Sequence, residues 1–154
     1  MTDPPADILE IVNSRLSGFN ETLGLRFTRA TPEEYAAELT VDERHLQPYG
    51  LVHGGVYASM VETVCSVGAA VGVFFEGKTA VGLDNSTSFL HAVRDGKLRC
   101  SASPIYQGRR TQVWEAQIHD DRDRLAATGR VRLLVLESGA KADGERVVLM
   151  GKKD

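Results

Sequence analysis

The stretch from Val56 to Phe75 constrains the fold more than any other part of this sequence, because Glu62 is its only charged residue. A helix of about 20 residues is roughly 30 Å long. This one would be apolar on nearly every side, so it must lie inside a protein or a membrane. A carboxylate in such surroundings is costly unless it has a function. We therefore expect a central helix that carries a functional Glu62.

A membrane span is the alternative for this helix. Ser59, Thr63 and Ser66 add polarity to Glu62, and no Trp flanks the segment. An acid in the middle of a span costs about 2.5–3.5 kcal/mol. The pattern favours the buried helix of a soluble protein. The first residues have no basic segment followed by an apolar one, so we expect no signal peptide and a cytoplasmic protein.

Composition narrows the class of protein. The chain has 154 residues, 42% of them hydrophobic and 25% charged, and a net charge of −3. One globular domain is expected, with neither nucleic acid nor a membrane surface as a partner. Cys65 and Cys100 are the only cysteines and have no metal-ligand spacing. We expect reduced core thiols, without a disulfide framework or a metal.

The order of the predicted elements indicates an α+β fold. A helical period over 7–18 follows a capping Asp7 and ends at Gly18, and short strands follow at 25–28 and 35–41. A loop over 47–55 leads into the central helix, which ends near Gly77.

The chain after Gly77 reads as strands. One long strand, bulged near Asn85, is followed by strands at 97–106, 112–120 and 125–136 with short turns, which predicts an antiparallel meander. We expect one antiparallel sheet wrapped around the central helix, a single domain over residues 1–137 and a mobile tail over 138–154. Within the tail, 147–150 could extend an edge of the sheet. Exposed sheet edges favour dimerisation.

Two glycines, Gly54 and Gly55, stand where the central helix begins. Unpaired N–H groups and the helix dipole at this end suit an oxygen that gains negative charge during acyl transfer. The alternative is that the glycines only allow a tight entry into the helix. Glu62 lies about 12 Å further along the helix, too far for both groups to act on one carbonyl within one chain. A two-fold dimer would bring the Glu62 of one chain beside the Gly54 of the other.

Other polar residues accompany this pair. Ser66 lies one turn beyond Glu62 and can orient its carboxylate, or bond back to its own helix. Gln47 can donate to and accept from a water molecule. His53 is interpreted as a positioning residue more than an acid–base catalyst, and His45, His91 and His119 as surface residues.

The combined spacing of Gln47, His53-Gly54-Gly55, Glu62 and Ser66 resembles the hotdog-fold acyl-CoA thioesterases. It is most similar to a branch with phenylacetate-type, 4-hydroxybenzoyl-CoA and 1,4-dihydroxy-2-naphthoyl-CoA thioesterases. The resemblance runs from about Phe19 to Glu137.

The resemblance implies a hotdog fold, dimers that pair into tetramers, and an acyl-CoA substrate with no separate cofactor. The residue at Gly54 would polarise the thioester carbonyl. Glu62 of the partner chain would act as nucleophile or general base, assisted by Gln47 and Ser66. The naphthoyl-CoA enzymes carry His near Phe89 or Leu90, so the acyl group is open.

The turn Gly108-Arg109-Arg110-Thr111 is the second candidate site. Forked arginine hydrogen bonds suit phosphates, although an ordinary surface turn has the same composition. With the resemblance, Arg109, Arg110 and Thr111 are interpreted as contacts to the nucleotide end of coenzyme A, and Gly55 as a contact to the substrate.

These features together predict a cytoplasmic thioesterase that hydrolyses an aromatic or medium-size acyl-CoA. Two alternatives remain. A hotdog hydratase or dehydratase would need a catalytic histidine, for which His53 is the only candidate in the central stretch. A non-catalytic acyl-CoA-binding protein would need an output module, for which 154 residues leave no room.

Overall fold

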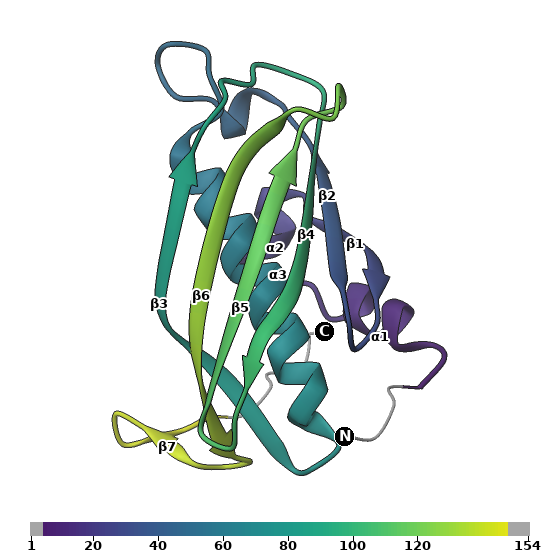
Figure 1. Ribbon diagram of the computed structural model, residues 1–154, viewed down its shortest axis with the longest axis vertical. Coiled ribbons are helices and arrows are strands. Elements are labelled where there is room, and N and C mark those ends of the chain that lie inside the picture. Colours follow the sequence, from purple (N-terminus) through teal and green to yellow (C-terminus); the bar gives the residue numbers. More distant parts are fainter. Residues whose placement is uncertain (1–4, 148–154) are drawn as a thin grey trace.

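A long helix, α3 (Gly54–Phe74), lies against one face of a six-stranded antiparallel sheet (Figure 1). The structure is a computed structural model and describes residues 5–147. By length and composition α3 could cross a membrane, but half of the residues in its most apolar 18-residue stretch are buried inside the fold. It is packed as a core helix, as its sequence predicts.

The sheet is formed by strands from both sides of α3 in the sequence. Its spatial order is β1-β2-β4-β5-β6-β3. The strand bounds are β1 (Arg26–Ala30), β2 (Tyr35–Thr40), β3 (Lys78–Phe89), β4 (Lys97–Gln107), β5 (Thr111–His119) and β6 (Leu125–Glu137). The α+β prediction is confirmed.

The predicted four-strand meander is wrong in one respect. Only β4, β5 and β6 form a meander, whereas β3 pairs with β6 at the far edge of the sheet. The position of β3 is set by where the chain leaves α3, which is at this edge of the sheet. The segment after β3 then crosses to β4, which lies between β2 and β5. The register of β3 shifts between Gly82 and Asp84, close to the predicted bulge.

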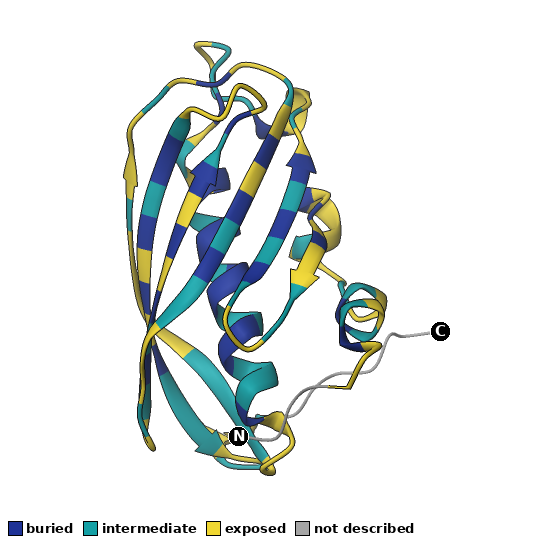
Figure 2. Cartoon of the chain, turned by 45° about the vertical axis from the view of Figure 1, so that its right-hand side comes forward, coloured by how far each residue is buried: buried dark blue, intermediate teal, exposed yellow. Residues whose placement is uncertain are grey.

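Alternating burial places the core between α3 and the sheet (Figure 2). Trp114 of β5 is fully buried and meets Tyr35 edge to face, with ring centroids 6.0 Å apart. A Cβ on Gly68 of α3 would lie 2.7 Å from the Trp114 ring. Gly68 therefore lets the helix approach the sheet at this large side chain.

The N-terminal segment differs from its prediction. Helix α1 (Ile8–Ser14) ends before Gly18, and Asp7 makes no side-chain capping bond. Gly18 instead precedes a second short helix, α2 (Phe19–Leu23), which was not predicted. Positive φ at Gly18 (58°) turns the chain between the two helices.

The described part of the tail forms a small hairpin of β7 (Lys141–Ala142) and β8 (Glu145–Arg146). Ser138 N–H donates to the Gly77 carbonyl at 2.8 Å, which joins the start of the tail to the end of α3. Of the predicted edge segment 147–150, residues 148–150 lie outside the described residues. The mobility of the tail stays a prediction, as does the boundary at 137.

Candidate active site

His53 caps the start of α3 and uses up one of the predicted donors. Its Nδ1 accepts the Gly55 N–H at 2.8 Å, and its carbonyl accepts the Val56 N–H at 2.9 Å. Among the described residues, the Gly54 N–H has no acceptor. Gly54 therefore supplies the free donor at the positive end of the helix dipole, and the Gly55 N–H is not free to bind a substrate.

The same contact determines the form of the His53 ring. A nitrogen that accepts from a backbone N–H carries no proton, so in the neutral ring the proton is on Nε2. The side chain is exposed, and Nε2 can donate to a ligand. This geometry suits a positioning role for His53 better than proton abstraction through Nδ1.

Gln47 lies in a tight loop before the helix. Its Oε1 accepts the Tyr49 N–H at 2.6 Å, and its carbonyl accepts the Gly50 N–H at 2.9 Å. One acceptor position of Oε1 is therefore used inside the loop, while the amide NH₂ of Gln47 is left to donate to a water or a substrate.

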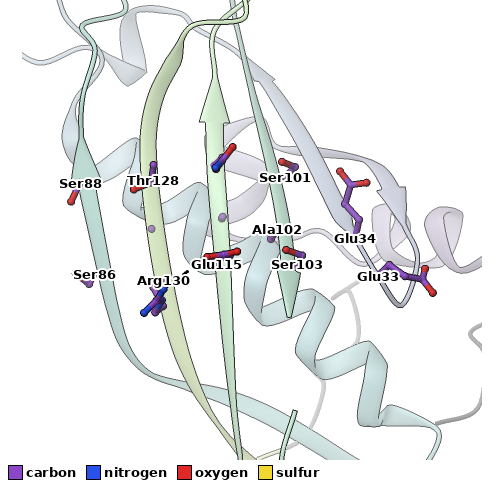
Figure 3. Close-up of a pocket in the computed structure, with 13 residues that line it drawn as sticks. Glu33, Glu34, Ser86, Ser88, Ser101, Ala102, Ser103, Glu115, Thr128 and Arg130 are labelled. Atoms are coloured by element: carbon purple, nitrogen blue, oxygen red, sulfur yellow. Dashed lines mark ion pairs between the residues drawn. The ribbon is translucent and has the colours of Figure 1, made fainter. Parts of the chain in front are cut away.

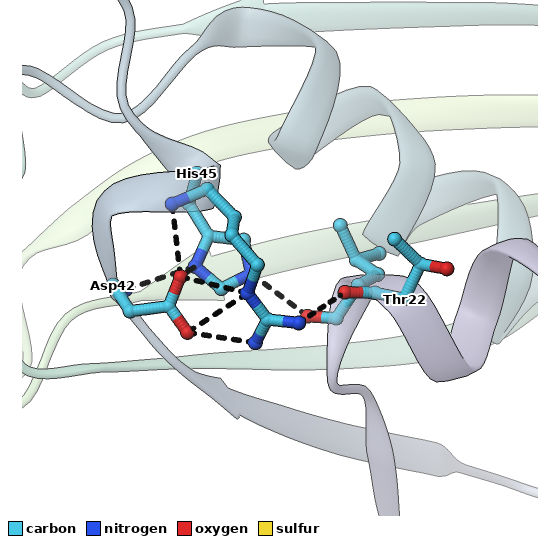
Figure 4. A network of polar contacts seen from close by, with 5 residues as sticks. Thr22, Asp42 and His45 are labelled. Carbon is cyan, nitrogen blue, oxygen red and sulfur yellow. Dashed lines mark hydrogen bonds and ion pairs between the residues drawn. The ribbon is translucent and has the colours of Figure 1, made fainter.

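A polar network around the buried His45 attaches the segment before this loop to α2 (Figure 4). Asp42 N–H donates to His45 Nδ1 at 2.9 Å, so Nε2 carries the proton and bonds the Leu23 carbonyl at 2.8 Å. Arg44 pairs with Asp42 and donates to the Thr22 carbonyl at 3.0 Å. The interpretation of His45 as a surface residue is wrong. It is 2% exposed, and its partner lies 22 residues earlier, which its local sequence does not indicate.

Glu62 lies on α3 with both carboxylate oxygens occupied. Ser66 Oγ donates to Oε1 at 3.1 Å, so Ser66 bonds Glu62 as one of its two interpretations predicts. Asn85 Nδ2 on β3 donates to Oε2 at 3.0 Å. The carboxylate also lies against Gly82, where any Cβ would collide with Oε1. Glu62 is thus fixed in place rather than freely rotating.

A pocket of about 500 Å³ opens beside this carboxylate. Glu62 is its only ionisable lining residue among the described residues, and two partly exposed rings, Phe19 and Phe89, also line it. Phe89 packs against Tyr57 with ring centroids 5.9 Å apart. Its ring also lies over Gly54, where a Cβ would come within 2.5 Å. The pocket therefore combines an acid with an apolar, aromatic wall.

Asn85 and Thr87 were missed as site residues by sequence reasoning. They are opposite Val131 and Gly129, two buried residues of β6, so both face α3. The available signal was polar residues at alternate positions of a strand that follows the helix. It could not be read without the register of β3.

The predicted residues form two groups within one chain. Gln47, His53 and Gly54 belong to the start of α3, whereas Glu62 and Ser66 lie two to three turns on, about 12 Å and more along the axis. A second pocket of about 340 Å³ includes His53 and Gly55 but not Glu62. Phe19 and Ser59 line both pockets, so the two groups are neighbours without sharing one cavity.

The predicted coenzyme A turn is at the other end of the molecule. Arg109 and Arg110 are exposed in the β4–β5 turn, near the end of α3, while Gly54 is at the opposite end of the helix (Figure 1). Thr111 closes the turn by accepting the Gly108 N–H at 2.9 Å. One chain does not bring this turn to Glu62 or to Gly54.

A larger groove, of about 1030 Å³, lies on the face of the sheet that is turned away from α3 (Figure 3). Four serines and Thr128 line it, together with Glu33, Glu34, and the pair Glu115 and Arg130 at 3.9 Å. None of the predicted site residues lines it. The candidate site is therefore the smaller pocket at Glu62.

The two cysteines are poor nucleophiles. Both are free and buried. Burial raises the pKa of Cys100 to about 12 and the pKa of Cys65 further. The thiolate form, which is the reactive one, is therefore suppressed in both, and Glu62 is left as the acid or nucleophile beside the pocket.

Comparison with known proteins identifies the family. The profile of the thioesterase superfamily matches residues 49–127. Rv1847 of Mycobacterium tuberculosis, an esterase by name, is 41% identical over 122 residues, which are 78% of this chain and 87% of the relative. Its structure covers 80% of this chain and 98% of its own, with a TM-score of 0.76.

Two further relatives are named as thioesterases. The proofreading thioesterase EntH of Cronobacter turicensis is 35% identical over 129 residues, 83% of this chain and 93% of its own. The structure of thioesterase HI1161 from Haemophilus influenzae is 34% identical, covers 89% and 96% of the two chains, and has a TM-score of 0.82. The chain therefore belongs to the thioesterase superfamily, and it is a thioester hydrolase with the hotdog fold.

Proposed function

We propose that this enzyme hydrolyses an aromatic or medium-size acyl-CoA to the free acid and coenzyme A. The observation that carries this proposal is the Glu62 carboxylate, held by Ser66 and Asn85 at the edge of a pocket with an aromatic wall. Phe19 and Phe89 are 64% and 57% exposed. Exposed rings of this kind can stack on an apolar or aromatic acyl group. The similarity to the branch of aryl-CoA thioesterases points the same way.

The chemistry follows from the two ends of the site. The Gly54 N–H donates to the thioester carbonyl oxygen as negative charge develops on it. Glu62 then either attacks the carbonyl carbon, giving an anhydride that water cleaves, or takes a proton from the attacking water. In both routes the C–S bond breaks, the thiolate leaves and receives a proton, and the acid is released. The NH₂ of Gln47 and the Nε2–H of His53 orient the water and the thioester.

We further propose that the site is completed by a second copy of the chain. The roughly 12 Å between Gly54 and Glu62 along α3 exceeds what one carbonyl can span. Strand β3 lies at an edge of the sheet and carries Asn85 beside Glu62. Pairing of two β3 edges is a natural route to a two-fold dimer with two identical sites. A homodimer that pairs into a homotetramer is the proposed assembly.

Coenzyme A recognition is assigned to the turn of Arg109, Arg110 and Thr111. Both arginines are exposed and can form forked bonds to phosphates. The turn lies far from the Gly54 end of its own chain, so it would reach a site built by other chains of the oligomer. No cofactor is proposed, because a carboxylate and water suffice for the reaction. A cytoplasmic location is supported by two free, buried cysteines.

A panel of acyl-CoAs with a thiol reagent tests the proposal. We expect release of free coenzyme A, fastest from aryl-CoA or medium-chain acyl-CoA. Conversion of the acyl group with the thioester intact would support a hydratase or dehydratase. Binding without turnover would support a non-catalytic acyl-CoA-binding protein. Either result would contradict the proposal, as would a preference for short, polar acyl groups.

A further inference from the structure

The amide of Asn85 has every contact needed to fix the direction in which it points. One Nδ2 contact is to Glu62 Oε2 at 3.0 Å, and the other is to the Ala58 carbonyl at 3.1 Å. Thr87 Oγ donates to the Asn85 oxygen at 2.6 Å. The Ala58 carbonyl and the Glu62 carboxylate can only accept, so both require Nδ2 on their side, and a flip of the amide would lose these two hydrogen bonds. The Thr87 hydroxyl adds a third hydrogen bond in the observed orientation, where it donates to Oδ1.

We propose that Asn85 is a positioning residue that holds the Glu62 carboxylate in its reactive orientation, and that Thr87 keeps the Asn85 amide turned toward it. The inference rests on the proposed catalytic role of Glu62. Without Asn85, Ser66 is the only side-chain donor to the carboxylate among the described residues, and one bond leaves the group free to rotate about its terminal torsions.

The position of these residues explains how the constraint acts. Asn85 and Thr87 are two residues apart on β3 and both face α3. One face of this strand therefore supplies both the residue that bonds Glu62 and the residue that bonds Asn85. Ala58 is one turn before Glu62 on the helix. By bonding Ala58 and Glu62 together, Asn85 ties the strand to the same turn that presents the acid. A shift of β3 along α3 would thus move the carboxylate.

Four variants separate positioning from simple stabilisation. Asn85→Ala removes the whole contact, and Thr87→Val removes only the hydrogen bond to the amide oxygen. Asn85→Asp keeps the shape and the acceptor for Thr87 but replaces the donor to Glu62 with a second carboxylate. Asn20→Ala is the matched control. Asn20 on α2 accepts from Thr63 at 2.8 Å, so it also ties α3 to another segment. Thr63 is the residue after Glu62, but this contact does not touch the Glu62 carboxylate.

The positioning role predicts a split between kcat and KM. Asn85→Ala should lower kcat by about ten- to one-hundredfold, the usual effect of one hydrogen bond to a charged group, with KM within about twofold. Thr87→Val should show a smaller fall in kcat. Asn20→Ala should lower the melting temperature as much as Asn85→Ala while keeping wild-type kcat.

The Asp variant tests whether residue 85 is electrostatically coupled to the group that limits kcat. Two carboxylates placed together share one proton over a wide pH range. The acidic limb of the kcat–pH profile should therefore move to higher pH in Asn85→Asp and stay in place in Asn20→Ala. An unmoved limb, or a kcat for Asn85→Ala within twofold of wild type, would overturn the inference.

Glu62→Gln is measured beside these variants. If Glu62→Gln is inactive and the Asn85 variants behave like wild type, the positioning inference fails alone. If Glu62→Gln keeps wild-type turnover, the proposed catalytic role of Glu62 fails, and the inference fails with it.

Discussion

Glu62 and Asp120 are acids that the fold holds in opposite ways. Glu62 borders a pocket and accepts from two neutral donors, Ser66 and Asn85. Asp120 is 2% exposed and accepts from the Arg122 and Arg124 N–H groups and the Arg124 guanidinium. The first arrangement leaves the carboxylate beside open space, and the second closes the β5–β6 turn. Only Glu62 is in a position to meet a substrate.

Glu62→Gln is the direct test at this residue. The amide keeps the volume but removes the nucleophile or base, so kcat should fall at least about a hundredfold. Circular dichroism and size-exclusion chromatography should show an unchanged fold and assembly. Turnover close to that of the wild type would exclude Glu62 as the catalytic acid.

The lowered pKa of Asp120 leads us to expect that the stability of the fold depends on pH. Burial alone would raise its pKa, but the Arg124 N–H, the Arg124 guanidinium and the Arg122 N–H outweigh that and lower the pKa to about 2. A lowered pKa means that ionised Asp120 stabilises the fold above its unfolded pKa of about 3.9, and that this contribution is lost as the pH falls toward 2.

We therefore expect Asp120→Asn to melt several degrees below the wild type at pH 6, and this difference to shrink steadily from pH 4 to pH 2. Melting curves across this range measure it. Asp121→Asn, at the exposed neighbouring acid, is the matched control and should show little difference at any pH. A gap for Asp120→Asn that is constant or grows toward pH 2 would contradict the assignment.

At the scale of elements, local patterns predicted α3 and its internal contact well. The His53-Gly54-Gly55 run marks the start of the helix, and the four-residue spacing placed Ser66 on the face of Glu62. Both are interactions within one turn or one cap. Their geometry follows from the helix itself.

Contacts between elements were not predictable in the same way. Asn85 reaches Glu62 across 23 residues of sequence, and only through the pairing of β3 with β6 at the edge of the sheet. His45 reaches Leu23 across 22 residues, through a helix that was not predicted. Such contacts depend on strand order and register, which turn residues between neighbouring strands do not specify.

The β4–β5 turn carries the prediction that belongs to this scale. If Arg109 or Arg110 binds the phosphates of coenzyme A, its alanine variant should raise KM for acyl-CoA about tenfold or more, since hydrogen bonds to charged groups contribute about 1.5–3 kcal/mol. KM for the matching acyl-pantetheine, which lacks the nucleotide, should stay the same. Equal changes for both substrates, or none, would make this an ordinary surface turn.

For the whole molecule, the separation of the two halves of the site along α3 is the main consequence of the fold. A helix packed along one face of a sheet cannot bend so that its first turn meets its third, so Gly54 and Glu62 of one chain stay about 12 Å apart. The edge position of β3 leaves room for a second chain beside Glu62. The central claim is therefore that each active site takes Gly54 from one chain and Glu62 from another.

Complementation between two inactive variants tests this claim most directly. Glu62→Gln removes the acid, and Gly54→Pro removes the N–H donor at a first helical position that tolerates proline. The exposed Phe89 ring must turn aside to admit the proline, so the fold of this variant is checked first by circular dichroism.

The two proteins, differently tagged, are mixed, reassociated and purified through both tags to verify heterodimers. Each heterodimer has one of its two sites with both an intact Gly54 and an intact Glu62. The randomly reassociated mixture should therefore recover about a quarter of the wild-type activity before purification, and the purified heterodimer about half. Verified heterodimers that stay inactive would place the donor and the acid of each site in one chain and contradict the shared site.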